Sequence, residues 1–264
     1  MNERTQLLRT ILLLAAVAAP AGLAAAAGDS YLSYSGTAVA RHSTHFLYGE
    51  QHELLYREER LAERVVLYTC RNGTPFARKI VSYVDPLAPD FAFEDASNGM
   101  RAGVRTLADG RSVFFRAGRI EPEKVKSLPQ TQGLVADSGF DEFIRVHWQE
   151  LAGGKHLALQ FLVPSRLDHM SFEAERLRTD TLEGVHVAVM RLKPAGPLGW
   201  VIPGIDVAYG ADDRVLMQYQ GVSDLRDAAG DNYQAEITFR PSDRKPGSAQ
   251  RMADARRVPL AACP

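Results

Sequence analysis

The sequence predicts a mainly β protein of the α+β class, in which a single curved antiparallel sheet, or half-barrel, encloses one amphipathic helix. Three observations predict this fold. Short segments that alternate between apolar and polar residues recur between residues 31 and 240, turn dipeptides separate them, and one stretch has the period of a helix. The composition, 45% hydrophobic and 24% charged over 264 residues, is that of a folded protein. With 31 Lys and Arg against 32 Asp and Glu, the chain lacks the basic excess that nucleic acid requires, so we expect no nucleic-acid partner.

The first 27 residues have the three parts of a cleavable signal peptide. Arg4 and Arg9 form a positive region, residues 11–23 are apolar, and the small residues 24–27 suit a signal peptidase. The alternative is a retained membrane anchor, but the apolar stretch is rich in alanine and is interrupted by a proline and a glycine. We therefore expect an exported protein, periplasmic or secreted, with no transmembrane span once residues 1–27 are removed.

The two cysteines fit an oxidising compartment. Cys70 follows the apolar segment 65–69, and Cys263 is the penultimate residue. Such a pair can form a disulfide, which would join the C-terminal end to an early strand. The alternative is a buried thiol at Cys70 and a free thiol at Cys263, because spacing does not show whether the two Cα atoms lie within reach.

The strand region is divided by turn dipeptides that favour hairpins. Asn72-Gly73, Asn98-Gly99 and Asp109-Gly110 tolerate the positive φ of tight turns. The expected pairings are 65–70 with 76–84, and 100–107 with 112–116.

Residues 139–152 form the predicted helix. Its core-facing side chains recur at helical spacing in one stripe: Phe140, Phe143, Ile144, His147, Trp148 and Leu151. Ser138 is placed to cap the start of the helix, with Asp141 closing a capping box, and glycines follow the end. A stripe this aromatic must be covered, and the concave face of the sheet is the large partner available.

The chain divides into one domain and a tail. No linker separates the strands of residues 28–240, so we expect a single half-barrel domain there. Residues 241–264 are polar, basic and interrupted by proline, which indicates a flexible C-terminal tail.

Motifs of familiar enzyme chemistry are absent from the sequence. It has no G-x-S-x-G, no phosphate-binding Gly-Lys-Ser/Thr loop, no H-E-x-x-H and no C-x-x-C, so we assign no catalytic residue, metal site or cofactor. His42, His45 and His52 could bind a metal if they converged, but the last two fall on opposite faces of an expected strand. His147 is the one candidate for a catalytic group, and a place in the helix stripe is the favoured interpretation.

A loop segment at residues 196–204 is apolar and rich in glycine and proline, and it contains Trp200 and Ile202. Apolar side chains in a loop meet a ligand, a partner or the protein's own core. Two interpretations follow: a loop that seals the end of the barrel, or a rim over an apolar cavity.

Motifs of a structural kind cover most of residues 33–240. They are Ala-Pro-Asp-Phe at 88–91, Gly-Phe-Asp-Glu-Phe at 139–143, Phe-Leu-Val-Pro-Ser-Arg at 161–166, Ile-Asp-Val-Ala-Tyr at 205–209 and Tyr-Gln-Gly-Val-Ser-Asp-Leu-Arg-Asp at 219–227. In this order they resemble a family of uncharacterised exported bacterial proteins. More distantly, the plan is similar to the half-barrel lipoprotein carriers of the periplasm (LolA/LolB-like), which implies a curved sheet that wraps a helix and holds acyl chains. The chain has no lipidation cysteine, so the resemblance implies a soluble carrier and not a membrane-anchored acceptor.

Three functions are weighed on these observations. The first is a soluble periplasmic or secreted protein that binds or carries a lipid, acyl chain or other apolar ligand in the half-barrel concavity. Its expected ligand-binding residues are Phe140, Phe143, Ile144, His147, Trp148, Trp200 and Ile202. The alternative is a non-enzymatic interaction or assembly protein of the cell envelope with a packed core, whose partner is another envelope protein. A hydrolase-type enzyme is the least favoured.

Overall fold

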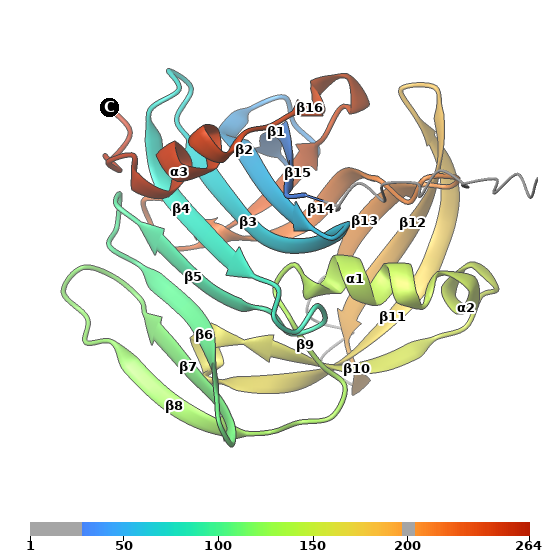
Figure 1. The fold of residues 1–264 in the computed structure, drawn as a ribbon, viewed down its shortest axis with the longest axis horizontal. Coiled ribbons are helices and arrows are strands. Elements are labelled where there is room, and N and C mark those ends of the chain that lie inside the picture. The colour runs from blue at the N-terminus through green and yellow to red at the C-terminus, as the bar shows by residue number, and fades with distance from the viewer. Residues whose placement is uncertain (1–27, 197–203) are drawn as a thin grey trace, which may run out of the picture.

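The structure is a computed structural model that describes residues 28–196 and 204–264. In these ranges sixteen strands form one open, curved sheet, seen in Figure 1. The strands are β1 (Ser30–Ala40), β2 (Phe46–Arg57), β3 (Arg60–Thr69), β4 (Pro75–Ser82), β5 (Asp90–Asp95), β6 (Arg101–Leu107), β7 (Gly110–Arg116), β8 (Lys124–Pro129), β9 (Leu134–Ala136), β10 (Leu157–Val163), β11 (Asp168–Leu182), β12 (Val185–Pro194), β13 (Ile205–Gly210), β14 (Leu216–Arg226), β15 (Asn232–Thr238) and β16 (Lys245–Pro246). The helices are α1 (Gly139–Val146), α2 (Trp148–Ala152) and α3 (Ala249–Arg257), with short 3-10 turns at Pro164–Arg166 and Pro241–Asp243.

The sheet has two arms. Strands β1 to β8 form the first arm and β9 to β15 the second, and antiparallel pairing of β1 with β15 joins them. Within each arm the neighbours in space are neighbours in sequence, so hairpin turns build most of the fold. The predicted hairpins β3–β4 and β6–β7 are confirmed. Gly73 takes a positive φ of 87° in the β3–β4 turn, and Gly99 takes 81° in the turn between β5 and β6.

The mainly β half-barrel architecture is therefore confirmed. Side chains alternate between an inner, concave face and an outer face of the sheet. The main inner cluster of the first arm surrounds Tyr48, Val66, Tyr68 and Phe93, and that of the second arm surrounds Met190, Leu192 and Val207.

The edges of the sheet meet without backbone pairing. Strand β9 pairs only with β10 in the described ranges, in parallel, and its Leu134 and Ala136 pack against Val81 and Val104 of the first arm. Lys126 of β8 reaches Asp168 of β11, with 2.6 Å between Nζ and Oδ2. These side chains, together with a 3.0 Å hydrogen bond from the Ala136 backbone N–H to the Leu87 carbonyl between β4 and β5, close the seam that the open sheet leaves.

The prediction of one enclosed helix is not confirmed. Residues 139–152 form two short helices, because His147 leaves the helical conformation, with φ −96° and ψ 16°. The ring of Phe143 lies 4.6 Å from the His147 ring, and Glu150 Oε1 lies 3.0 Å from its Nδ1. These contacts hold the side chain at the break, which no proline or glycine marks in the sequence.

The start of α1 also differs from the expectation. The side chain of Ser138 makes no capping hydrogen bond; its Oγ instead accepts one from the Tyr83 hydroxyl at 2.9 Å. The apolar stripe does pack against the inner face of β10 to β13, where Ile144 and Trp148 are buried beside Tyr209. In the described ranges, no helix is long and apolar enough to cross a membrane.

The C-terminal segment 241–264, expected to be flexible, is bound to the outer face of the first arm. Met252 and Ala255 of α3 cover a patch around Leu55, Val65 and Leu67. Ser248 caps the helix by accepting a hydrogen bond from the backbone of Arg251. A helix with two core-facing side chains has a weak periodic signal, which is why its sequence suggested a tail.

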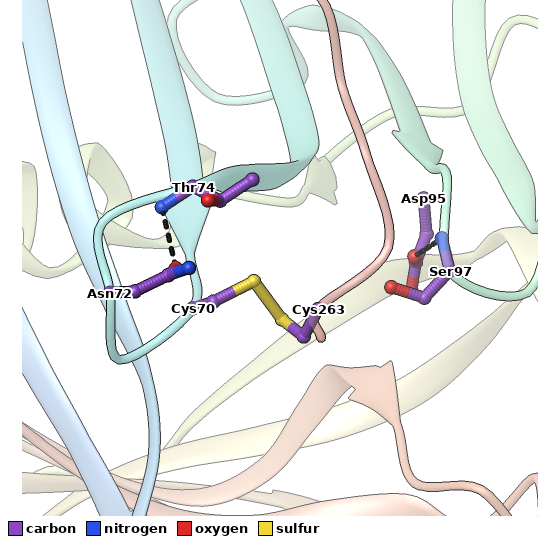
Figure 2. Close-up of a disulfide and its surroundings, with 6 residues drawn as sticks. All are labelled: Cys70, Asn72, Thr74, Asp95, Ser97 and Cys263. Atoms are coloured by element: carbon purple, nitrogen blue, oxygen red, sulfur yellow. Dashed lines mark hydrogen bonds between the residues drawn. A yellow bond between two sulfur atoms is a disulfide. The ribbon is translucent and has the colours of Figure 1, made fainter.

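The Cys70–Cys263 disulfide is present, with 5.6 Å between the two Cα atoms (Figure 2). Cys70 lies at the end of β3, where Thr74 donates a backbone hydrogen bond to the Asn72 side chain in the adjoining turn. The bond thereby fixes the last residues of the chain beside the β3–β4 hairpin. Of the two alternatives for the cysteines, the disulfide is confirmed.

Candidate ligand-binding cavity

A cavity of about 460 Å³ lies between the two arms, on the concave face of the sheet. Much of its wall is apolar and aromatic, with Phe91, Phe93, Met100, Phe115, Phe161, Phe172, Leu192, Ile205 and Val207 among the lining residues. Ligand sites in proteins are typically concave, mainly apolar and about 300–1,000 Å³ in volume. The cavity is therefore of a size and character suited to a small ligand.

The cavity is elongated. Its lining includes both Leu216 at the start of β14 and Arg226 at the end. A regular strand rises about 3.3 Å per residue, so the ten steps between these positions span at most roughly 33 Å, and the register shifts of β14 shorten this span. An extended molecule fits such a space better than a compact one.

Charged side chains cross the inner face of the first arm. Lys79 on β4 contacts Asp137, which follows β9, and Asp224 on β14, with Nζ to Oδ2 distances of 2.5 and 2.6 Å. Burial alone would lower the pKa of Lys79, but the two carboxylates raise it well above its ordinary value. Burial would likewise raise the pKa of Asp137, but Lys79 lowers it. The ammonium group therefore stays charged and joins three separate segments across the concavity.

A second ion pair lies beside the first. Arg64 on β3 is buried, and its Nη2 lies 3.3 Å from Oδ2 of Asp141 in the first turn of α1. The Tyr209 hydroxyl of β13 donates to the other oxygen of Asp141 at 2.8 Å. Because β3 belongs to the first arm and β13 to the second, Asp141 ties the start of α1 to both.

A buried histidine stands next to this group on the inner face. The ring of His52 stacks on Tyr34 with 4.4 Å between ring centroids, and its Nε2 lies 2.8 Å from Oε2 of Glu50. Burial lowers the pKa of His52, and the hydrogen bond to Glu50 opposes that shift only in part. His52 is therefore neutral at pH 7 and donates from Nε2 to the carboxylate.

The residues predicted from the sequence to bind a ligand have different places. Phe140 lines the cavity, whereas Phe143, Ile144 and Trp148 are buried against the strands under the helices. The half-exposed His147 contacts Phe143 and Glu150 outside the cavity lining. Trp200 and Ile202 lie outside the described residues.

Sequence reasoning did not find the charged residues of the cavity: Glu50, Arg64, Lys79, Asp137, Asp141, Asp224 and Arg226. A signal for two of them was available. Side chains alternate between the two faces of a strand, so Arg64 lies on the same inner face of β3 as Val66 and Tyr68. In the same way, Lys79 lies on the same inner face of β4 as Val81. A charged residue in the apolar phase of a strand marks a buried polar site. Within the part of the chain that the structure describes, no three His, Cys, Asp or Glu side chains are grouped to hold a metal.

Comparisons with known proteins find distant likenesses among solved structures. No protein-family model and no curated protein sequence matches the chain. A solved beta-barrel-like protein of the domain of unknown function DUF1849 from Brucella abortus is similar over 84% of this chain and 98% of its own, at 9% identity and a TM-score of 0.41. A putative outer membrane lipoprotein-sorting protein domain from Vibrio parahaemolyticus is similar over 86% and 89%, at 9% identity and a TM-score of 0.28. A DUF1329 family protein from Desulfovibrio piger is similar over 84% and 87%, at 6% identity and a TM-score of 0.26.

The fold and the cavity together define a class: a mainly β half-barrel with a partly charged internal cavity. The structural neighbours are too distant to carry a functional argument.

Proposed function

We propose that this protein is an exported binding or carrier protein that holds an amphiphilic ligand, a lipid or acyl chain, inside the half-barrel. The observation that carries the proposal is the elongated cavity of about 460 Å³, whose wall is apolar for most of its length and charged in part. An apolar chain lies along the aromatic wall, and the polar end of the ligand lies near the charged side chains. Export is supported by the pattern of residues 1–27 and by the disulfide, which is typical of oxidising compartments.

The apolar wall supplies the affinity in this proposal. Burial of a methylene group contributes about 0.8 kcal/mol, so about twelve buried methylenes contribute roughly 10 kcal/mol. Association costs at least about 4 kcal/mol in lost freedom. The remaining 6 kcal/mol or so corresponds to dissociation constants of tens of micromolar, before polar contacts are added.

Binding is tested by filling the cavity. Ala102 lines the cavity on β6, and a tryptophan there would occupy the space of the ligand. We expect Ala102→Trp to lose binding of a fluorescent hydrophobic probe that the unaltered protein binds. Ala92→Trp is the matched control, because Ala92 is exposed on the neighbouring strand β5, facing outward.

Native mass spectrometry of the exported protein gives the second readout. Co-purified lipid that is absent from Ala102→Trp and present in Ala92→Trp is the expected result. Bare protein that also fails to bind the probe contradicts the proposal and favours an envelope interaction protein with a packed core.

A further inference from the structure

The end of β14 presents two opposite charges to the cavity. The pairing of β14 with β15 shifts register between Val222 and Arg226, which indicates a β-bulge. Bulges re-aim side chains, and here Val222, Ser223, Asp224 and Arg226 all line the cavity. The bulge thus places an acidic and a basic residue, two positions apart, at one end of the elongated space.

Each of the two charges has capacity to bind a ligand. The side chain of Asp224 is 61% exposed and engages Lys79 through Oδ2. The guanidinium of Arg226 lies over the Phe115 ring, 5.7 Å from its centroid. Its Nε is buried without a hydrogen bond, and within residues 28–196 and 204–264 no carboxylate pairs with it.

The charge balance favours a ligand that brings both signs. Lys79 is shared by Asp137 and Asp224, and Arg226 offsets the negative charge that this leaves. Arg64 pairs with Asp141, so Glu50 beside the neutral His52 gives the lining one net negative charge. A lone anion would add to this charge in a partly desolvated site, where unpaired charge is costly, and a lone cation would leave Arg226 without a partner. A zwitterion adds no net charge, and its two ends match the two side chains.

The dimensions favour a single chain. At about 460 Å³ the cavity lies in the lower half of the range of about 300–1,000 Å³ that is typical of sites for small ligands. A two-chain lipid has about twice the apolar volume of its single-chain counterpart, so the single chain is the better fit.

We propose that the ligand is a single-chain zwitterionic amphiphile of the lysophospholipid kind. Its acyl chain lies in the cavity, Arg226 donates hydrogen bonds to its phosphate, and its ammonium group lies against Asp224. Arginine suits this role because its planar guanidinium can bind phosphate with two parallel hydrogen bonds. This inference rests on the proposed function and adds the class of ligand to it.

The test compares ligands with the same palmitoyl chain, measured by calorimetry on the mature protein. The ligands are lysophosphatidylethanolamine, lysophosphatidic acid, monopalmitoylglycerol and the two-chain phosphatidylethanolamine. We expect the zwitterion to bind at least tenfold tighter than the neutral glyceride, as charge-assisted hydrogen bonds imply. We expect the two-chain lipid not to bind.

Two variants assign the contacts. Arg226→Met should weaken both phosphate-bearing ligands about tenfold or more and leave the glyceride unchanged. Asp224→Asn should weaken the zwitterion and not lysophosphatidic acid, which has no ammonium group. Arg105→Met is the matched control, because Arg105 lies over Phe114, 5.4 Å from its centroid, and is exposed.

The possible failures are distinguishable. Glyceride and zwitterion bound equally, with no effect of Arg226→Met, would overturn the head-group assignment while the proposed function stands. Binding of the two-chain lipid as tightly as its single-chain counterpart would overturn the single-chain assignment. If none of the ligands binds, the proposed function itself fails. Unchanged denaturation midpoints confirm that the variants fold.

Discussion

The Cys70–Cys263 disulfide should be a large single contributor to the stability of the fold. It links residues separated by 193 positions. In the chain-entropy relation, closing a loop of that length stabilises the folded state by about 5 kcal/mol at 25 °C. Cys263 lies in an exposed part of the chain, so its replacement leaves no cavity, whereas Cys70 is buried in the inner cluster of the first arm, so Cys70→Ala adds a small packing loss.

We therefore expect Cys70→Ala/Cys263→Ala to unfold at a clearly lower guanidinium concentration, with a loss of up to about 5 kcal/mol. Most of this loss of stability arises because the unfolded chain gains conformational freedom without the cross-link. The folded state changes little, since α3 keeps its packing on Leu55 and Val65. Tryptophan fluorescence reports the transition, since Trp148 is buried in the second arm.

Reductant supplies the control for this prediction. It should lower the midpoint of the unaltered protein to that of the variant and leave the variant unchanged. Equal midpoints for the oxidised protein and the variant would refute the loop-entropy reasoning. A reductant effect on the variant would show that the shift has another source.

Two further predictions concern the buried charges. Lys79→Met should lower the free energy of unfolding by about 3–5 kcal/mol, because it leaves Asp137 buried without its cation. Adding Asp137→Asn should recover part of that loss. As a control in the same denaturation assay, Lys126→Met, which breaks an exposed pair with Asp168, should cost less than about 1 kcal/mol. His52 should make the stability of the protein sensitive to acid. Burial lowers the pKa of His52 below the value of about 6.5 in the unfolded chain. Its contribution to the free energy of unfolding is therefore complete above pH 6.5 and is lost as the pH falls below that value. Asp137, whose pKa is also lowered, adds a second loss below about pH 4. His52→Gln should flatten the dependence between pH 7 and 5, and an unchanged slope would contradict the assignment.

The sequence predicted the parts of the fold that local chemistry decides. Turns with Asn-Gly, as at residues 72–73, and the alternation in β15 depend on neighbours in the chain, so the hairpins could be predicted. The break at His147 could not, because contacts made in the folded state set it. Helix α3 was missed because only Met252 and Ala255 of its nine residues are buried.

The cavity was beyond sequence reasoning for a related reason. In β4 the alternation with Val81 marks Lys79 as an inward residue beside the outward Arg78, but nothing in the local sequence indicates which carboxylates Lys79 meets. Arg78 donates to Glu94 on the outer face, whereas Lys79 meets carboxylates from β14 and from the link after β9. Asp137 is separated from Lys79 by 58 positions and Asp224 by 145, and only the closed sheet brings them together.

The buried charges also explain why the concavity is not filled. An ion pair in a protein interior contributes less stability than well-packed apolar side chains of the same volume. The first arm nevertheless places Arg64 and Lys79 on its inner face, where aliphatic residues could have packed against α1. Their carboxylate partners lie on the second arm and at the start of α1, so the pairs act as fixed spacers between surfaces that would otherwise collapse onto each other. The ion pairs thus keep an elongated space open, at some cost in stability relative to an apolar core. This combination is expected of a protein whose interior holds a ligand.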